Sequence, residues 1–251
     1  MSNALERHTL VWLTAAGWDA AIADAQPEHV AGLAQWRHHD WPTIVRRTDP
    51  RPASNGGSVA SADGAVAENG DTAAGANGTV AGDGGAGRDD VCLGVPLPPD
   101  ADGVKVRIPL RASAGHIART SAPLDLRAAL PAAGPWREGL AKLAGAAPSL
   151  RVFGSLAMQS LTGLHYVSPA SDIDLLFHPA SAGQLDEVIA LLAHHAAELP
   201  LDGEIVFPGG AAVSWKEWLM ATRHPAKVMV KELGAVRLAA TASLLATLEA
   251  S

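Results

Sequence analysis

Short stretches of alternating apolar and polar residues predict β-strands along most of the chain. The clearest alternation runs over Val104–Leu110, where Val104, Val106 and Ile108 alternate with basic residues, as expected of a half-buried strand. Shorter apolar runs bounded by turn residues indicate further strands. These are expected at His8–Thr14, Thr43–Thr48, Val91–Leu97, Leu150–Phe153, Ser171–Phe177, Gly203–Phe207, Lys227–Lys231 and Ala235–Leu238.

Helical stretches lie between these runs. Pro27 suits the first turn of a helix at Pro27–His38, and Ser214–Glu217 fits the capping-box pattern that opens another. Because strands and helices interleave without repeats, the predicted fold class is α/β or α+β. The remaining helices are expected at Pro123–Leu130, Pro135–Ala144, Ser155–Leu161, Gly183–Leu199 and from Thr241.

Residues 51–90 differ in composition from the rest of the chain. Twenty of these residues are Gly or Ala, and only three valines could contribute to a core. Such a segment cannot bury enough apolar surface to offset its ordering entropy. We therefore expect a flexible insertion that expands a hairpin loop, since long surface insertions cost little free energy. A tether for a partner protein is the alternative.

Charge and cysteine content exclude several functional classes. The formal net charge is −7, of which residues 51–90 carry −4, so that −3 remains for the rest of the chain. This balance does not favour general nucleic-acid binding. Cys92 is the only cysteine, so neither an internal disulfide nor a thiolate zinc cluster can form. Neither a signal peptide nor a membrane span is evident, and we expect a cytoplasmic protein.

Residues Phe153–Phe177 carry the candidate chemistry. Gly154 and Ser155 follow an apolar strand and open a helix, where free N–H groups can seat a phosphate. Asp172 and Asp174 lie on the next predicted strand, and residues two apart project from the same face. Convergent carboxylates form a hard oxygen site of the kind that Mg²⁺ prefers. A phosphate cradle beside such a site indicates phosphoryl or nucleotidyl transfer.

The order strand, Gly-Ser helix, Asp-x-Asp strand resembles the polymerase-beta-like nucleotidyltransferases. Sixteen residues separate Ser155 from Asp172, a longer spacing than is usual there, so this segment is expected to shape the substrate site. The resemblance implies a mixed sheet with helices in a catalytic domain over residues 135–251, preceded by a smaller α/β region over 1–134. It also implies a third carboxylate that binds the metal or deprotonates the attacking hydroxyl. Glu204, inside a predicted strand, is preferred, and Asp202 is the alternative.

Within that superfamily the chain is similar to the phosphoribosyl-dephospho-CoA transferases that act as holo-acyl-carrier-protein synthases of malonate decarboxylase. The similarity rests on His8–Leu13, Ile44–Arg47, Phe153–Phe177, Asp202–Pro208 and Trp215–Trp218. It implies that a serine of the apo acyl-carrier subunit attacks the α-phosphate of 2′-(5″-triphosphoribosyl)-3′-dephospho-CoA and releases pyrophosphate.

The resemblance also implies roles for individual residues. Asp172 and Asp174 would hold Mg²⁺, Gly154 and Ser155 would seat the triphosphate, and Glu204 or Asp202 would assist the nucleophile. Basic residues should neutralise a triphosphate, and among many scattered candidates Arg46, Arg47 and Lys227 are favoured. The alternatives are a nucleotidyltransferase for the citrate lyase carrier, a small molecule or an RNA end, and a silent protein that binds a carrier protein or nucleotides.

Overall fold

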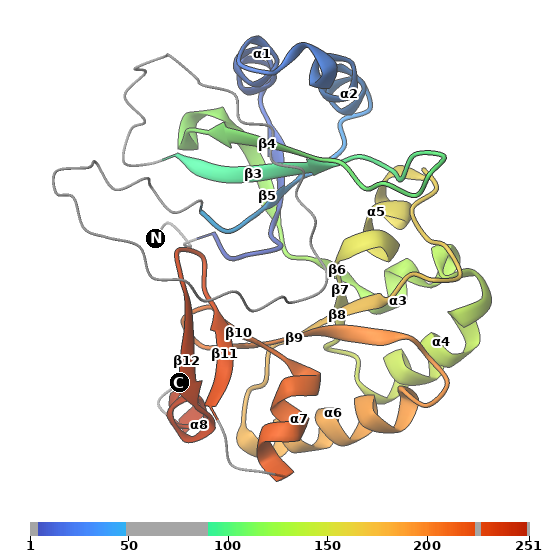
Figure 1. The fold of residues 1–251 in the computed structure, drawn as a ribbon, viewed down its shortest axis with the longest axis vertical. Coiled ribbons are helices and arrows are strands. Elements are labelled where there is room, and N and C mark those ends of the chain that lie inside the picture. Colours follow the sequence, from blue (N-terminus) through green and yellow to red (C-terminus); the bar gives the residue numbers. More distant parts are fainter. Residues whose placement is uncertain (1–4, 49–89, 224–226, 250–251) are drawn as a thin grey trace, which may run out of the picture.

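The computed structural model describes residues 5–48, 90–223 and 227–249, and its strands form two sheets (Figure 1). Among these residues the N-terminal sheet has the strand order β4-β3-β2-β1-β5, with every pair of neighbours antiparallel. Its strands are β1 (Leu10–Leu13), β2 (Thr43–Val45), β3 (Val91–Pro96), β4 (Arg107–Ala112) and β5 (Ile117–Ser121).

Two helices, α1 (Ala15–Ala23) and α2 (Pro27–His38), lie together beside this sheet (Figure 1). The Thr14 side chain caps α1 by accepting a hydrogen bond from the N–H of Gly17 at 3.0 Å. Trp36 of α2 is fully buried in the N-terminal core and donates its indole N–H to the Pro42 carbonyl at 3.1 Å. This pairing satisfies the polar end of a large apolar side chain.

The C-terminal sheet has the strand order β12-β11-β10-β9-β8-β7-β6 among the described residues. Its one parallel pair there is β8 with β9, and the other neighbours run antiparallel. The strands are β6 (Leu124–Asp125), β7 (Arg151–Val152), β8 (Ile173–Phe177), β9 (Leu201–Phe207), β10 (Ala211–Ser214), β11 (Lys227–Lys231) and β12 (Val236–Ala240).

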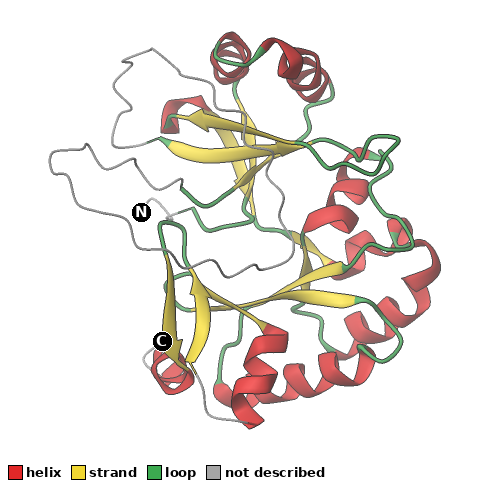
Figure 2. Cartoon of the chain, viewed as in Figure 1, coloured by secondary structure: helices red, strands yellow, loops and turns green. Residues whose placement is uncertain are grey.

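Helices pack against this second sheet (Figure 2). Helix α5 joins the two halves of the molecule, because Leu156 and Ala157 belong to the C-terminal core whereas Met158 belongs to the N-terminal core. None of the helices in the described part of the chain is long and apolar enough to span a bilayer. The helices are α3 (Leu126–Ala129), α4 (Arg137–Ala146), α5 (Gly154–Thr162), α6 (Ala182–His195), α7 (Trp215–Arg223) and α8 (Thr241–Glu249), with 3₁₀ turns at Ala114–His116, Leu130–Ala132 and Gly134–Trp136.

The α/β class predicted from the sequence is confirmed, and two elements, α2 and β11, have the predicted bounds. The strand predicted at Val104–Leu110 is wrong in its first half. Val104 and Val106 are 55% and 38% exposed, and β4 begins only at Arg107. The cause is a turn, in which the Asp100 carboxylate accepts hydrogen bonds from two backbone N–H groups, including that of Val104.

Several other elements differ from the prediction. The pattern did not predict α1, β5 or β10, and α1 is so rich in alanine that it shows little polar-to-apolar contrast. The helix expected at Pro123–Leu130 begins instead with the short strand β6. The strand expected from His8 begins at Leu10, because His8 has a left-handed backbone with φ 68°.

The chain passes from one half to the other before residue 134. Strand β6 already belongs to the C-terminal sheet, and Leu126, Ala129 and Ala133 belong to its core. Of the insertion at residues 51–90, all but Asp90 lies outside the described residues. The flanking strands β2 and β3 pair antiparallel, with Ile44 opposite Gly94, as the hairpin interpretation expects.

Candidate active site

Gly154 stands at the start of α5, where the chain turns sharply out of β7. Its backbone has φ +65°, a conformation that L side chains rarely adopt. A Cβ atom at this position would overlap Oδ2 of Asp174. The N–H of the preceding residue, Phe153, donates to the Asp174 carbonyl at 3.0 Å. The predicted proximity of the Gly-Ser turn and the second aspartate is therefore present, and only glycine fits this contact.

The acidic residues around Asp174 come from two neighbouring strands. Asp172 is exposed just before β8, whereas Asp174 is half-buried within it. Asp202 of β9 is the register partner of Asp174 in the parallel pair. The pKa of Asp174 is raised to about 6, mainly by burial and then by the charges of Asp202 and Asp172. The positive charges of Lys105 and Arg107 oppose this rise. Asp202 is thus an electrostatic neighbour of Asp174.

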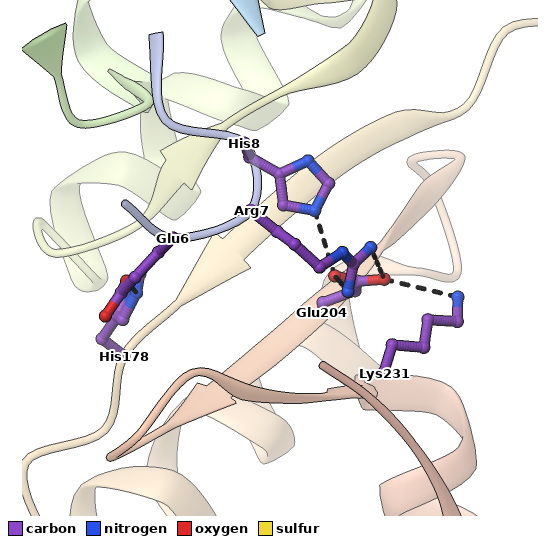
Figure 3. A network of polar contacts seen from close by, with 6 residues as sticks. All are labelled: Glu6, Arg7, His8, His178, Glu204 and Lys231. Carbon is purple, nitrogen blue, oxygen red and sulfur yellow. Dashed lines mark hydrogen bonds and ion pairs between the residues drawn. The ribbon is translucent and has the colours of Figure 1, made fainter. Parts of the chain in front are cut away.

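Glu204 lies two residues after Asp202 on β9, is buried, and is surrounded by basic side chains instead of acidic ones (Figure 3). Its carboxylate contacts Arg7 and His8 at 3.1 Å and Lys231 at 3.3 Å. Burial alone would raise its pKa, but the hydrogen bond with His8 and the nearby positive charges lower the pKa to about 2. Its oxygens are therefore engaged by cationic and imidazole groups, and we do not assign it as a metal ligand.

A cavity of about 660 Å³ lies between the two halves of the molecule, with Gly154, Ser155 and Asp174 in its wall. Both halves contribute to it, so neither half alone would form it. Among the described residues that line the cavity, basic side chains outnumber acidic ones, and the carboxylates there are those of Asp174 and Glu204. The cavity wall is therefore strongly cationic. These basic side chains are Arg7, Arg46, Arg47, Lys105, Arg107 and Lys231.

Hydrogen bonds fix the positions of two of these basic side chains, Lys105 and Arg46, at the cavity wall. Lys105 donates its ammonium to the Ser155 hydroxyl at 3.1 Å, which brings the N-terminal half onto the start of α5. Arg46 donates its Nε–H to the Leu93 carbonyl at 3.2 Å, which fixes the stem of that guanidinium at the cavity wall. Lys227, on β11, is exposed and is not among the described lining residues.

Sequence reasoning did not select several residues that the fold brings to this cavity. Lys105, Arg107 and Lys231 were only three among many scattered bases, and Arg7 and His8 gave no sign of approaching β9. They come from the N-terminal segment, the loop before β4, the first residue of β4 and the end of β11, which are far apart in the chain. Only the similarity over His8–Leu13 marked that segment, and it did so without indicating a contact.

Both halves of the chain match known families. Family models for the N-terminal and C-terminal domains of phosphoribosyl-dephospho-CoA transferase MdcG match residues 6–59 and 119–242. The phosphoribosyl-dephospho-CoA transferase of Bradyrhizobium diazoefficiens is 36% identical over 220 residues, covering 84% of this chain and 80% of that protein. That of Xanthomonas euvesicatoria pv. vesicatoria is 35% identical over 246 residues, covering 95% of both. The chain belongs to the phosphoribosyl-dephospho-CoA transferase family.

The family matches include cavity residues from both halves of the molecule, whereas Lys105 and Arg107 lie between the two matched ranges. The match to the N-terminal domain includes Arg7, His8, Arg46 and Arg47, and the match to the C-terminal domain includes the whole Phe153–Phe177 stretch. No solved structure gave a significant match to the chain.

The carboxylates suit a hard divalent cation. The pKa of Asp174 is raised because its charge is desolvated and lies near other acids, and a bound cation would relieve this repulsion. Within the described residues, no group of three or more His, Cys, Asp and Glu side chains forms a ready-made metal cluster. Mg²⁺ does not require one, since it is commonly held by one or two carboxylates together with water and substrate phosphates. Asp172 and Asp174 fit that pattern.

Proposed function

We propose that this protein transfers the phosphoribosyl-dephospho-CoA group from 2′-(5″-triphosphoribosyl)-3′-dephospho-CoA to a serine of the apo acyl-carrier subunit of malonate decarboxylase. The serine oxygen bonds to the α-phosphorus, and the bond from that phosphorus to the bridging oxygen of the β-phosphate breaks. Pyrophosphate leaves with the electron pair, and a phosphodiester joins the prosthetic group to the carrier. Family membership supports the transferase activity, whereas the carrier and the leaving group are part of the proposal.

The observation that carries the proposal is the cationic cavity with the Gly154–Asp174 contact in its wall. A substrate with a triphosphate and an internal diphosphate carries several negative charges, and the described basic lining is complementary to them. The cavity is also large enough for an extended nucleotide-like ligand. A protein that bound only a carrier surface would have no use for a desolvated aspartate in this position.

Each residue then has a task. The free N–H groups at the start of α5 seat phosphate oxygens beside Ser155, and Lys105 and Arg107 neutralise the phosphate charge. Asp172 and Asp174 would hold Mg²⁺, which when bound would orient the triphosphate and offset charge on the leaving pyrophosphate. Asp202 is the acid placed to support Asp174, since the two are paired in register.

A transfer assay tests this function. The protein is incubated with Mg²⁺, the triphosphoribosyl precursor and apo malonate decarboxylase carrier, and the carrier is weighed by mass spectrometry while pyrophosphate is measured. The carrier should gain the mass of the phosphoribosyl-dephospho-CoA group in a one-to-one ratio with pyrophosphate. Parallel reactions contain the apo citrate lyase carrier, or ATP in place of the precursor. Modification of the citrate lyase carrier alone, or nucleotidyl transfer from ATP alone, would overturn the assignment.

A further inference from the structure

The imidazole of His8 lines the cavity. It is held in one orientation, with one ring nitrogen directed at Glu204 (Figure 3). On one side its ring lies 4.0 Å from that of Phe153, centroid to centroid. At one end its Nε2 lies 3.1 Å from Glu204. The backbone N–H of His8 donates to the Val45 carbonyl at 3.0 Å, which holds the left-handed conformation of this residue. A histidine fixed by contacts from both halves of the molecule is pre-organised for a specific task.

The same contacts determine which ring nitrogen is available. Burial lowers the pKa of His8, and the nearby charges of Arg7 and Lys231 also lower it, against the opposing influence of Glu204. The ring is therefore neutral at pH 7 and carries a single N–H. The ionised carboxylate of Glu204 can only accept a hydrogen bond, so this proton resides on Nε2. Nδ1 consequently has a free lone pair, and the imidazole has no other hydrogen bond within the described residues.

His8 also lies close to the reacting groups of the proposed function. Phe153, which contacts the imidazole ring, is bonded through its N–H to the Asp174 carbonyl and directly precedes Gly154. The described cavity lining includes His8, Gly154, Ser155 and Asp174. An acceptor oriented by a carboxylate and placed beside a phosphate-transfer site has the arrangement of a general base.

We propose that His8 is the general base of the transfer and that Glu204 is its positioning residue. This inference rests on the proposed function. As the carrier serine oxygen bonds to the α-phosphorus, its proton passes to Nδ1 of His8. Glu204 then stabilises the resulting imidazolium through the hydrogen bond at Nε2. The proton leaves the imidazolium to solvent after the phosphodiester has formed. Arg7 and Lys231 keep Glu204 ionised, so that it always accepts and never donates.

The variant H8Q tests the base while preserving the structural contact. The Gln amide can donate to Glu204 as Nε2–H does, but it offers no basic nitrogen. We expect kcat to fall roughly 100- to 1,000-fold, with little change in KM for the precursor and in melting temperature. The matched control is H178Q, because His178 also forms a His–Glu pair, with Glu6 at 3.5 Å, but is exposed. H178Q should retain wild-type kcat.

Imidazole rescue of H8A separates a base from a structural role. Imidazole added to this variant should restore part of kcat, and the restored rate should rise with the concentration of unprotonated imidazole. E204Q should show a smaller loss of kcat that imidazole does not restore. If H8Q keeps wild-type kcat, or if folded H8A binds the precursor but shows no rescue, the inference fails. If the wild-type protein itself transfers nothing to the carrier, it is instead the proposed function that fails.

Discussion

The carboxylate of Asp174 lies so close to the α-carbon of Gly154 that a side chain at residue 154 would displace it. Residues on two different elements, α5 and β8, thus specify one another through a steric contact. The same contact brings the N–H groups at the start of α5 beside the acid proposed to hold Mg²⁺. The Gly-Ser turn and the Asp-x-Asp strand therefore form one structural unit, and each of them can be tested through the other.

The variant G154A should abolish transfer. The added methyl group collides with the carboxylate, and alanine also has to adopt φ +65°. G163A is the matched control, because Gly163 has φ +73° but a methyl group added there would meet no atom within 4 Å. Both variants should lose roughly 1–2 kcal/mol of stability from the left-handed backbone. Only G154A should lose transfer activity, which would be seen in single-turnover assays as a lower rate constant for transfer. Equal activity in the two variants would mean that the contact has no role in transfer.

The variant D174N should abolish transfer and yet stabilise the protein. The pKa of Asp174 is raised to about 6 in the fold, so the folded state binds a proton more tightly than the unfolded chain. The stability that the protonated Asp174 carboxyl contributes is therefore lost as the pH rises through about 6. At pH 7 and above, the ionised carboxylate destabilises the fold. Removing that charge should raise the free energy of unfolding by up to about 3 kcal/mol without metal.

This gain should be visible in urea titrations at pH 7.5 with EDTA. It should shrink as the pH falls toward the ordinary range of an aspartate, where both states bind the proton. Added Mg²⁺ should stabilise the wild-type protein and have less effect on D174N, since a ligand that binds only the folded state stabilises it. A destabilised D174N at pH 7.5 would contradict the electrostatic argument.

The variant E204Q should have the opposite effect on stability. The pKa of Glu204 is lowered to about 2 by His8, Arg7 and Lys231, so its contribution is fully present above the ordinary glutamate range. We expect a loss of about 3 kcal/mol at pH 7. The difference from wild type should narrow as the pH falls from about 4.5 toward 2, because the wild-type carboxylate then becomes protonated. Urea titrations across this range measure it, and a pH-independent difference would refute the ionic origin of the loss.

The variant K105A should weaken substrate binding more than it slows chemistry. The Lys105 ammonium of the wild-type protein donates a hydrogen bond to Ser155, where the substrate phosphates are proposed to bind. Without it we expect KM for the triphosphoribosyl precursor to rise roughly tenfold, equivalent to about 1.4 kcal/mol. K142A is the control, because Lys142 forms an exposed pair with Glu138 on α4. Initial-rate kinetics at saturating carrier separate the two constants. A selective loss of kcat in K105A, with KM unchanged, would reassign this lysine to the chemical step.

The sequence predicted much of the fold because its information is local. Pro27 marked the first turn of α2, and a short apolar run marked β11, so both were predicted at their observed bounds. The alternating pattern failed where a turn interrupted it before Arg107. The Gly-Ser turn and the Asp-x-Asp strand were accessible for the same reason. They lie within one short stretch, and strand and turn geometry alone bring their side chains together.

The sequence pattern could not predict which of Asp202 and Glu204 lies beside Asp174 and which pairs with basic residues. Both acids share one face of a strand, so periodicity treats them alike, and the sequence analysis preferred Glu204. In the structure Asp202 pairs in register with Asp174, whereas Glu204 binds Arg7, which is 197 positions away in the chain. A buried carboxylate must find a partner, but which partner it finds depends on long-range packing.

By itself, then, the sequence determined the α/β class, the Gly154–Asp174 unit and the resemblance to a transferase family. Each of these follows from residues that are close in the chain or from a pattern that covers all of it. Only the tertiary structure decided which cations face the phosphate seat and that His8 lies beside Phe153. Those contacts form at the interface between the two sheets. Side-chain periodicity describes only neighbouring residues in the chain, so it cannot predict which residues of the two sheets come into contact.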